Sequence, residues 1–375
     1  AVTPEHQPVS RIGAECTLDL ASAARNNLFV PGRHGCDRMA KQRRAGLWHL
    51  SLSHYRGEVL WYLKLIHEFS VNAGREKDWQ DPEWHMLDQG GYGSGARWHL
   101  RTATEHNDLD LARWCLEHGA NPNSPPERDK RFPQRSLYEQ ALLLGETDMA
   151  ELLARYGATR IDPERDSEDA FIAACFRRDR EGADALIKQH PEYLKSPAAL
   201  HMAAKQNRAD VIEFLLDLGV SPEVENPSKA TALHEAAYAG AAEAVDFLIR
   251  HGAKIDPVDS THDATPLWWA MWAQRERVIT MLAPYSRDVW ALNFIGHLER
   301  VREVLAAEPR LATMTGESTP LFWLPDDEQK AVATVELFLS LGADASFRRK
   351  SDGLTAADVA RRRQLHAAAD LLDAF

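Results

Sequence analysis

The feature that most constrains this chain is a pattern that repeats after 33 residues. Its two clearest copies contain Leu-His-x-Ala-Ala, a short break, two apolar residues and then a glycine. The first copy runs from Leu200 to Gly219, and the second runs from Leu233 to Gly252. A fixed period of this length is typical of proteins built from stacked units that bury their apolar faces against their neighbours. The sequence therefore predicts a long, continuous stack, which presents an extended surface rather than a pocket inherited for catalysis.

The end of each predicted unit is marked by a residue that stops a helix. Glycine followed by alanine ends three other apolar runs, at Gly119, Gly157 and Gly342. In units that lack this glycine, a proline stands nearby, as at Pro191, Pro284 and Pro309. Glycine adopts the left-handed backbone at a helix end, and proline stops a helix because it has no amide proton. The units therefore continue in phase even where their sequences have diverged.

These residues resemble the ankyrin repeat, whose pattern is Thr-Pro-Leu-His-x-Ala-Ala, a turn, a second helix with paired leucines, and Gly-Ala-Asp. The Thr-Pro-Leu start is present at 265–267 and again at 319–321. Threonine caps a first helix and proline fits its first position, while the alanine pair lets neighbouring units approach closely. The resemblance covers residues 96–375 clearly and residues 17–95 weakly, in roughly eleven units.

The resemblance implies an all-α fold, an ankyrin-like helical-repeat solenoid with an irregular N-terminal part. We expect residues 1–95 to form degenerate N-terminal repeats that carry an inserted loop at 74–94, and residues 96–375 to form the repeat array. We also expect both members of each leucine pair to be buried. Near the C-terminus, the pattern predicts a short first helix at 321–324.

The insertion at 74–94 contains two tryptophans and the sequence Gly91-x-Gly93-x-Gly95. Loops of this length without structure of their own are uncommon and are often functional. The glycine spacing matches neither a dinucleotide-binding loop nor a P-loop, and no strand precedes it, so we expect no nucleotide cofactor. We expect this loop to be more mobile than the repeats, and either to pack on them or to close over a ligand.

The charge distribution argues against nucleic acid as a partner. The net charge is −12, and residues 136–375 hold 26 Lys+Arg against 39 Asp+Glu. An acidic stack repels a phosphate backbone. The charge either serves solubility or attracts a cationic peptide or protein.

Membrane and metal partners are also not expected. No run of 18 apolar residues is present, and the chain does not start with a signal-like segment. Four cysteines are scattered, which favours a reducing, cytoplasmic location. Cys115 and Cys175 occupy apolar helix positions and are predicted to be buried thiols. Cys16, His34 and Cys36 lack metal-ligand spacing, so no metal or other cofactor is predicted.

In ankyrin-like stacks, the first helices and loop tips line a concave groove, and the residues flanking the alanine pair face it. The resemblance therefore implies a partner-binding surface at these positions. Its candidate residues are Lys205, Glu235, Tyr238, Trp269, Trp272 and Trp323. The histidines His201 and His234 occupy the slot where the family bonds neighbouring loops, so we expect a structural role for both.

The unit at 267–272 departs most from the pattern, since it contains three tryptophans in five residues. Trp268 replaces the histidine of the family, and we expect it to pack between repeats. Trp269 and Trp272 are three residues apart and share a helix face. Exposed aromatic residues are often hot spots of protein binding, so these two either bind a partner or belong to the core.

Two functions from different classes follow. The first is a non-enzymatic scaffold that holds another protein or peptide in the concave groove, with a basic partner as one of the options. The alternative is an enzyme or small-molecule binder whose Trp- and His-lined site is closed by the loop at 74–94. Its candidate acid–base residues are His54, His85, Asp88, Glu105 and His106.

Overall fold

The computed structural model describes residues 60, 64, 95–123, 135–315 and 319–375. Two compact units divide the chain, one made of residues 1–103 and 108–134 and the other of 104–107 and 135–375. Within the described ranges every regular element is a helix and no strand occurs, which confirms the all-α prediction. The predicted loop at 74–94 lies outside the described residues, as does nearly all of the expected irregular N-terminal part.

The described part of the first unit contains most of α5 (Gly95–Glu105) and all of α6 (Leu109–Glu117). Helix α5 precedes α6, and the side chain of Asp108 caps α6 by accepting a 2.9 Å hydrogen bond from the amide of Leu111. Cys115 is buried in α6, as predicted.

The second unit continues as helix pairs with a few short 3-10 helices. Its first elements are α7 (Leu137–Leu143), α8 (Thr147–Arg155), α9 (Glu168–Arg177), α10 (Arg180–Gln189), η1 (Pro191–Lys195), α11 (Ala198–Lys205) and α12 (Ala209–Asp217). The middle of the unit contains α13 (Ala232–Ala239), α14 (Ala242–Arg250), α15 (Pro266–Trp272), α16 (Glu276–Leu282) and α17 (Val289–Phe294). The last elements are α18 (Leu298–Ala307), η2 (Pro309–Thr313), η3 (Pro320–Phe322), α19 (Glu328–Ser340), α20 (Ala356–Arg362) and α21 (His366–Asp373).

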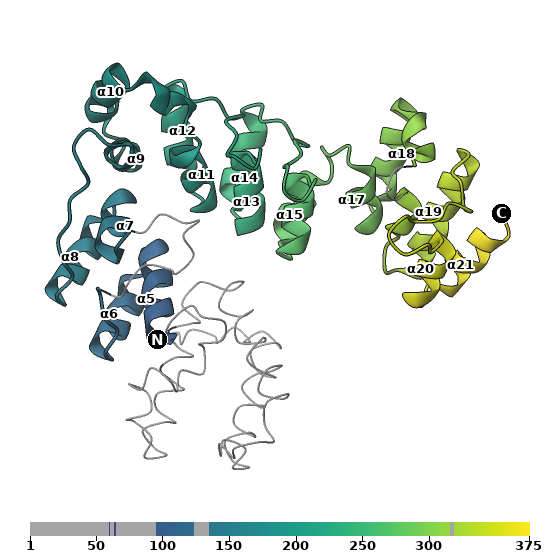
Figure 1. Ribbon diagram of the computed structural model, residues 1–375, viewed down its shortest axis with the longest axis horizontal. Helices are drawn as coiled ribbons and strands as arrows, with labels where there is room; N and C mark the ends of the chain where they lie inside the picture. The colour runs from purple at the N-terminus through teal and green to yellow at the C-terminus, as the bar shows by residue number, and fades with distance from the viewer. Residues whose placement is uncertain (1–59, 61–63, 65–94, 124–134, 316–318) are drawn as a thin grey trace, which may run out of the picture. The chain divides into compact units, whose positions relative to one another are not determined.

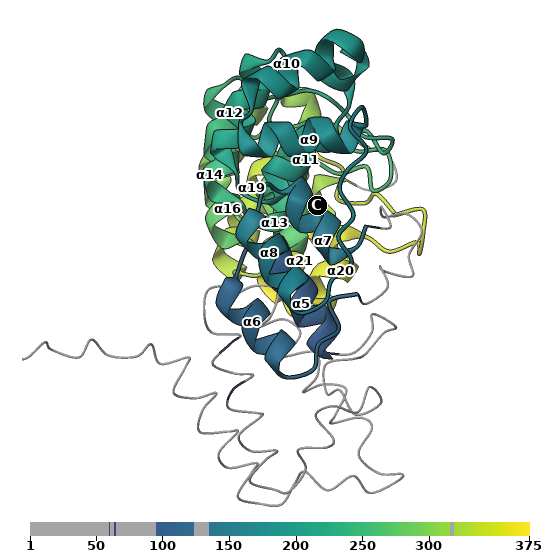
Figure 2. The same cartoon turned by 90° about the vertical axis from the view of Figure 1, so that its left-hand side faces the viewer.

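The helices of the middle repeats form two layers (Figures 1 and 2). The first helix of each pair packs on the first helix of the next, so α11 contacts α13 and α13 contacts α15. The second helices α12, α14 and α16 pack on one another in the same order. The alanine pairs of α11 and α13 are fully buried, and one apolar cluster extends from Leu143 to Leu372. Small residues at the contact allow the close approach of neighbouring helices that the sequence predicted.

The helix ends follow the predicted chemistry. Gly219 and Gly252 have φ values of 97° and 80°, in the left-handed region that favours glycine. After Gly219, the amide of Val220 donates a 3.0 Å hydrogen bond to the carbonyl of Leu215, which closes the helix end. In a unit without this glycine, α10 ends at Gln189 and Pro191 begins a 3-10 helix.

His201 and His234 each bond to a loop of the next repeat, as expected. Nε2 of His201 lies 2.9 Å from the carbonyl oxygen of Val224, and Nε2 of His234 lies 3.1 Å from that of Ala264. Because a carbonyl only accepts, Nε2 carries the proton in both rings. Both rings are buried, so their role is structural.

The prediction that both members of each apolar pair are buried holds for Leu152-Leu153 in α8 and for Val304-Leu305 in α18, but it is wrong for the second member in α12 and α14. Leu215 and Leu248 are fully buried, whereas Leu216 and Ile249 are only partly buried. Successive residues on a helix point about 100° apart, and in α12 and α14 the second member points partly away from the centre of the layer.

The short helix predicted at 321–324 is also wrong in type and length. The structure has only the 3-10 helix Pro320–Phe322, and Trp323 leaves it with φ −112° and ψ 53°. Pro325 follows two residues after Trp323 and cannot donate an amide, so a helix could not continue through it.

Threonine and proline begin two first helices, although the threonine of α15 does not cap it. Pro266 and Pro320 occupy the predicted first positions. Thr265 instead donates its hydroxyl proton to Oδ2 of Asp288, 2.9 Å away in the next unit. The side chain therefore joins two units rather than closing its own helix.

Candidate functional site

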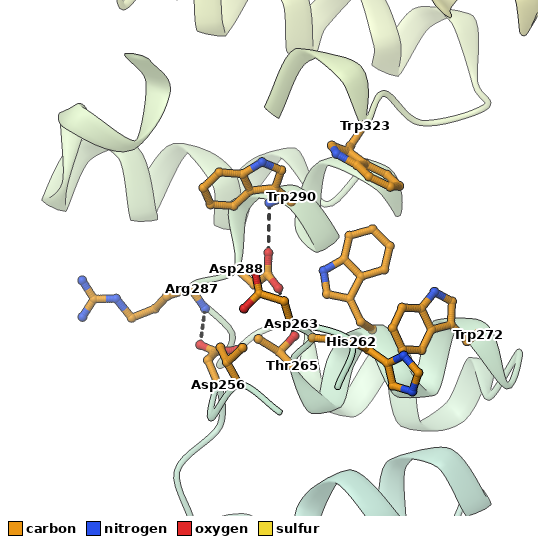
Figure 3. A pocket seen from close by; sticks show the side chains of 12 residues that line it. Asp256, His262, Asp263, Thr265, Trp272, Arg287, Asp288, Trp290 and Trp323 are labelled. Atoms are coloured by element: carbon orange, nitrogen blue, oxygen red, sulfur yellow. Dashed lines mark hydrogen bonds between the residues drawn. The ribbon is translucent and has the colours of Figure 1, made fainter. Parts of the chain in front are cut away.

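A pocket of about 560 Å³ lies between the repeat that contains α15 and the repeats that follow it (Figure 3). Its walls come from the loop before α15, from α15 itself, from the start of α17 and from the residue after η3. The lining residues are Asp256, Val258, His262, Asp263, Ala264, Thr265, Trp268, Trp272, Arg287, Asp288, Trp290 and Trp323. A volume of this size is in the range of pockets that bind small ligands or side chains.

Trp268 is the centre of an aromatic cluster on one wall. Its ring centroid lies 5.0 Å from that of Trp323, 6.0 Å from Phe294 and 6.2 Å from Trp272. Trp268 packs against the apolar core, as expected, but it is only partly buried and also lines the pocket. The early end of η3 places Trp323 at this cluster, which therefore joins three consecutive units.

The loop before α15 fixes the position of Trp269. Oδ1 of the buried Asp259 accepts 2.8 Å hydrogen bonds from the amides of Thr261 and His262, and Oδ2 accepts one of 3.0 Å from Nε1 of Trp269. Burial raises the pKa of Asp259, but these hydrogen bonds outweigh it, and the pKa is lowered from its usual value. Asp259 therefore stays ionised and holds the indole in place.

Two carboxylates deeper in the pocket are already bonded within the protein. Asp288 accepts from the amides of Trp290 and Ala291 and from the hydroxyl of Thr265. Asp256 accepts from the hydroxyl of Ser286. Burial raises the pKa of both carboxyls, and their hydrogen bonds only partly offset the effect. These two groups add negative charge to the pocket and have few lone pairs left for a ligand.

The remaining charged groups at the pocket, Asp263 and Arg287, differ in whether they are bonded to other residues. Asp263 is exposed, and no hydrogen bond or ion pair of its carboxylate is recorded among the described residues. Arg287 donates its amide to Asp256, whereas its guanidinium pairs with Glu308 and points away from the tryptophans (Figure 3). Among the described lining residues, the exposed carboxylate is therefore that of Asp263, and the exposed guanidinium of Arg287 is paired with Glu308.

Comparison with known proteins agrees with this architecture. The family model of ankyrin repeats, in three copies, matches residues 200–293, which run from α11 into α17. The protein contains ankyrin repeats. An ankyrin repeat domain from Acinetobacter baumannii is 24% identical in an alignment that covers 47% of this chain and 96% of that domain, with a TM-score of 0.35. No curated protein matches the chain.

Ankyrin repeats are in general protein-interaction modules, and the aromatic residues predicted to face the groove differ in exposure. Tyr238 and Trp272 are 53% and 52% exposed. Trp269 lies between them in the chain of ring contacts, 6.0 Å from Tyr238, but it is only partly exposed. His262 stacks edge-on with Trp272 at 5.5 Å and with Trp269 at 6.4 Å. The rings therefore form one continuous chain from the ankyrin helix α13 to the pocket.

The charged candidates Lys205 and Glu235 lie in the two units before the tryptophans. Lys205 is exposed, whereas Glu235 is partly buried, with Oε1 4.0 Å from Nδ1 of His201. Burial raises the pKa of Glu235, and the charge of Lys205 opposes this rise. Glu235 and Trp269 are thus only partly exposed, because Glu235 lies beside His201 and Trp269 bonds to Asp259 within the ankyrin stack.

The residues of the enzyme alternative are only partly visible. His54, His85 and Asp88 lie outside the described residues, Glu105 is partly buried at the end of α5, and His106 is exposed. Within the described ranges, no group of three or more His, Cys, Asp or Glu side chains could hold a metal ion. The same ranges contain no helix with the length and apolarity needed to cross a membrane. The enzyme alternative stays a prediction.

Sequence reasoning missed several residues of the pocket. Asp263 and Asp288 were not singled out, and Phe294 was not connected with the tryptophans. The available signal was the density of tryptophan around α15, which marked the right unit. The partners of Trp268 come from two later units, and their positions depend on the stacking geometry.

Proposed function

We propose that this ankyrin-repeat protein binds another protein or a peptide, without catalysing a reaction. The proposed contact surface runs along the first helices from α11 to the pocket behind α15. Its residues are Lys205, Glu235, Tyr238, Trp269, Trp272 and Trp323. The single observation that carries the proposal is the exposure of Tyr238 and Trp272, about half of each side chain, on adjacent units.

Large exposed aromatic side chains that form one group are uncommon on a protein surface without a binding role. Tyr238 and Trp272 connect through Trp269 and His262, so a partner that covers one ring meets the next. Tyrosine and tryptophan also supply large contact areas at a small loss of conformational entropy.

The charges near these rings favour a cationic partner. Asp263 is exposed at the pocket, and Glu235 lies beside the tyrosine. The acidic balance of residues 136–375 acts in the same direction. Cation–π contact with the indoles adds attraction for a basic side chain.

The test begins with selection of binding peptides from a random display library on the immobilised full chain. Affinities of the selected peptides are then measured for the wild type, Tyr238→Ala and Trp272→Ala. We expect each variant to bind at least about 10-fold more weakly, as hot-spot residues do.

Tyr285→Ala is the matched control, because Tyr285 is 56% exposed but lines neither the pocket nor the chain of ring contacts. Thermal unfolding establishes that all variants are folded. Peptides that bind Tyr238→Ala and Trp272→Ala as tightly as the wild type would contradict the proposed surface.

A further inference from the structure

We propose that the pocket between Trp268, Trp272 and Trp323 receives the guanidinium group of an arginine side chain from the partner. This inference rests on the proposed binding function and names the chemical group that the surface recognises. It follows from three observations, namely the orientation of the indoles, the free carboxylate at the pocket and an arginine of the chain that binds the same aromatic cluster.

The indoles present walls of different orientation. The rings of Trp268 and Trp323 are inclined by 73°, and those of Trp268 and Trp272 by 35°. No lysine or arginine among the described residues is recorded over the ring of Trp268 or Trp272. A guanidinium is planar and weakly hydrated, so it stacks on an indole face at a smaller desolvation penalty than an ammonium.

The carboxylates provide the complementary charge. Asp263 accepts no hydrogen bond from any residue that the structure describes, while Asp256 and Asp288 are bonded to amides and hydroxyls of the protein. A guanidinium stacked on an indole still directs its N–H groups outward in its own plane, where a carboxylate can accept two of them. The only described cation that lines the pocket, Arg287, is paired with Glu308 outside it.

The chain itself shows how an arginine binds the neighbouring side of this cluster. The guanidinium of Arg363 lies 5.5 Å over the ring of Phe294, which is 6.0 Å from Trp268 and 6.2 Å from Trp323. It donates to the carbonyl of Leu324 at 2.6 Å and to Asp326 at 2.5 Å. Ring, carboxylate and carbonyl together form one arginine site, and the pocket offers rings and a carboxylate in a similar combination.

Other cations fit this arrangement less well. The ammonium of lysine is a compact, strongly hydrated charge without a planar face. A trimethylated lysine stacks against aromatic rings but has no N–H group for Asp263. Citrulline is not a cation, but its neutral side chain has nearly the shape of arginine, so it serves as the uncharged comparison. These three side chains therefore separate the contributions of shape, charge and hydrogen bonding.

The experiment uses the full chain with ¹⁵N-labelled tryptophan and four capped peptides, Gly-Gly-X-Gly-Gly, in which X is arginine, lysine, trimethyllysine or citrulline. Indole N–H signals are followed by NMR during titration, and Trp272→Phe assigns the signal of Trp272. We expect the arginine peptide to shift this signal saturably, with an affinity at least 5-fold above that of each other peptide.

Asp263→Asn tests the carboxylate, since asparagine also accepts the left-handed backbone that Asp263 adopts at φ 53°. We expect this variant to bind the arginine peptide at least 3-fold more weakly. Asp162→Asn is the control, because it removes the same charge at an exposed aspartate outside the pocket. Equal weakening by both variants would overturn the role of Asp263 as a specific contact.

Different experimental results would contradict the arginine site and the protein-binding surface. Equal binding of arginine and citrulline, tighter binding of lysine or trimethyllysine, or no shift of the Trp272 signal by any peptide would overturn the arginine site. If library peptides still bind through Tyr238 and Trp272 in those cases, the protein-binding function stands. If library peptides bind elsewhere while the arginine peptide shifts Trp272, the pocket stands and the wider surface does not.

Discussion

Nε1 of Trp269 donates a 3.0 Å hydrogen bond to Oδ2 of Asp259, a carboxylate that is buried in the loop preceding the same helix. This contact joins the loop at 256–265 to α15 and sets the direction of the indole. It also places His262 between Trp269 and Trp272, since the other oxygen of Asp259 accepts from the amide of His262. One buried charge therefore orders both the loop and part of the proposed contact surface.

Removal of this carboxylate should destabilise the protein. We expect Asp259→Ala to lower the free energy of unfolding by about 1–3 kcal/mol, because the indole and two amides lose their acceptor in a buried place. Urea denaturation followed by circular dichroism measures the change. The control Asp263→Asn removes an exposed carboxylate and keeps a residue that tolerates the left-handed backbone at this position, so it should change the free energy of unfolding by less than about 0.5 kcal/mol. Equal stability of wild type and Asp259→Ala would contradict the structural role of this contact.

The packing of the second helices predicts unequal effects within one leucine pair. Leu215→Ala should lower the free energy of unfolding by about 2–5 kcal/mol, since it removes a fully buried side chain and leaves a cavity. Leu216 is only partly buried, so Leu216→Ala should lower it by less than half as much. Chemical denaturation of both variants checks the difference. A larger effect at Leu216 would mean that the helix is rotated relative to this structure.

Protonation of His234 should oppose folding in mild acid. Burial lowers the pKa of His234, and its hydrogen bond to the carbonyl of Ala264 only partly compensates. As the pH falls below about 6.5, the imidazole of the unfolded chain binds a proton. The buried ring of the folded protein stays neutral to a lower pH, so protonation favours the unfolded state. This histidine's contribution to the free energy of unfolding is complete above about pH 6.5 and is lost as the pH falls below it.

The comparison for His234 is urea unfolding of wild type and His234→Gln at pH 7.5 and pH 5.5. We expect the variant to be less stable at pH 7.5, because the buried bonds to Thr231 and Ala264 are weakened. It should also lose less stability than the wild type between the two pH values. An identical loss in both proteins would show that another group governs this range.

The buried thiols should resist modification while the protein is folded. Burial raises the pKa of Cys175 to about 12 and that of Cys115 to about 12 as well. Because the thiolate is the reactive form, both should react with iodoacetamide at least about 100-fold more slowly than after unfolding in urea. Peptide mapping by mass spectrometry measures each site. Rapid labelling of Cys175 in the native protein would place it at an accessible surface.

The sequence alone determined the repeat unit and hence the fold. Periodic glycines, the alanine pairs and the Leu-His dipeptides each act within one unit or between nearest neighbours, so their roles can be inferred from spacing. Gly219 takes the left-handed backbone, His201 and His234 bond the next loops, and Cys175 is buried, all as predicted. Local chemistry is repeated in every unit, and repetition makes its meaning recognisable.

Only the tertiary structure decided which aromatic rings are available and what surrounds them. The sequence marked α15 by its tryptophans, but the buried Asp259 withdraws Trp269 from full exposure, and Trp268 meets Trp323 from a unit more than fifty residues later. Trp323 leaves η3 with non-helical backbone and lines the pocket. These contacts depend on how units of unequal length stack on one another. Spacing along the chain does not encode that geometry, because small changes in one unit alter the position of side chains in the next.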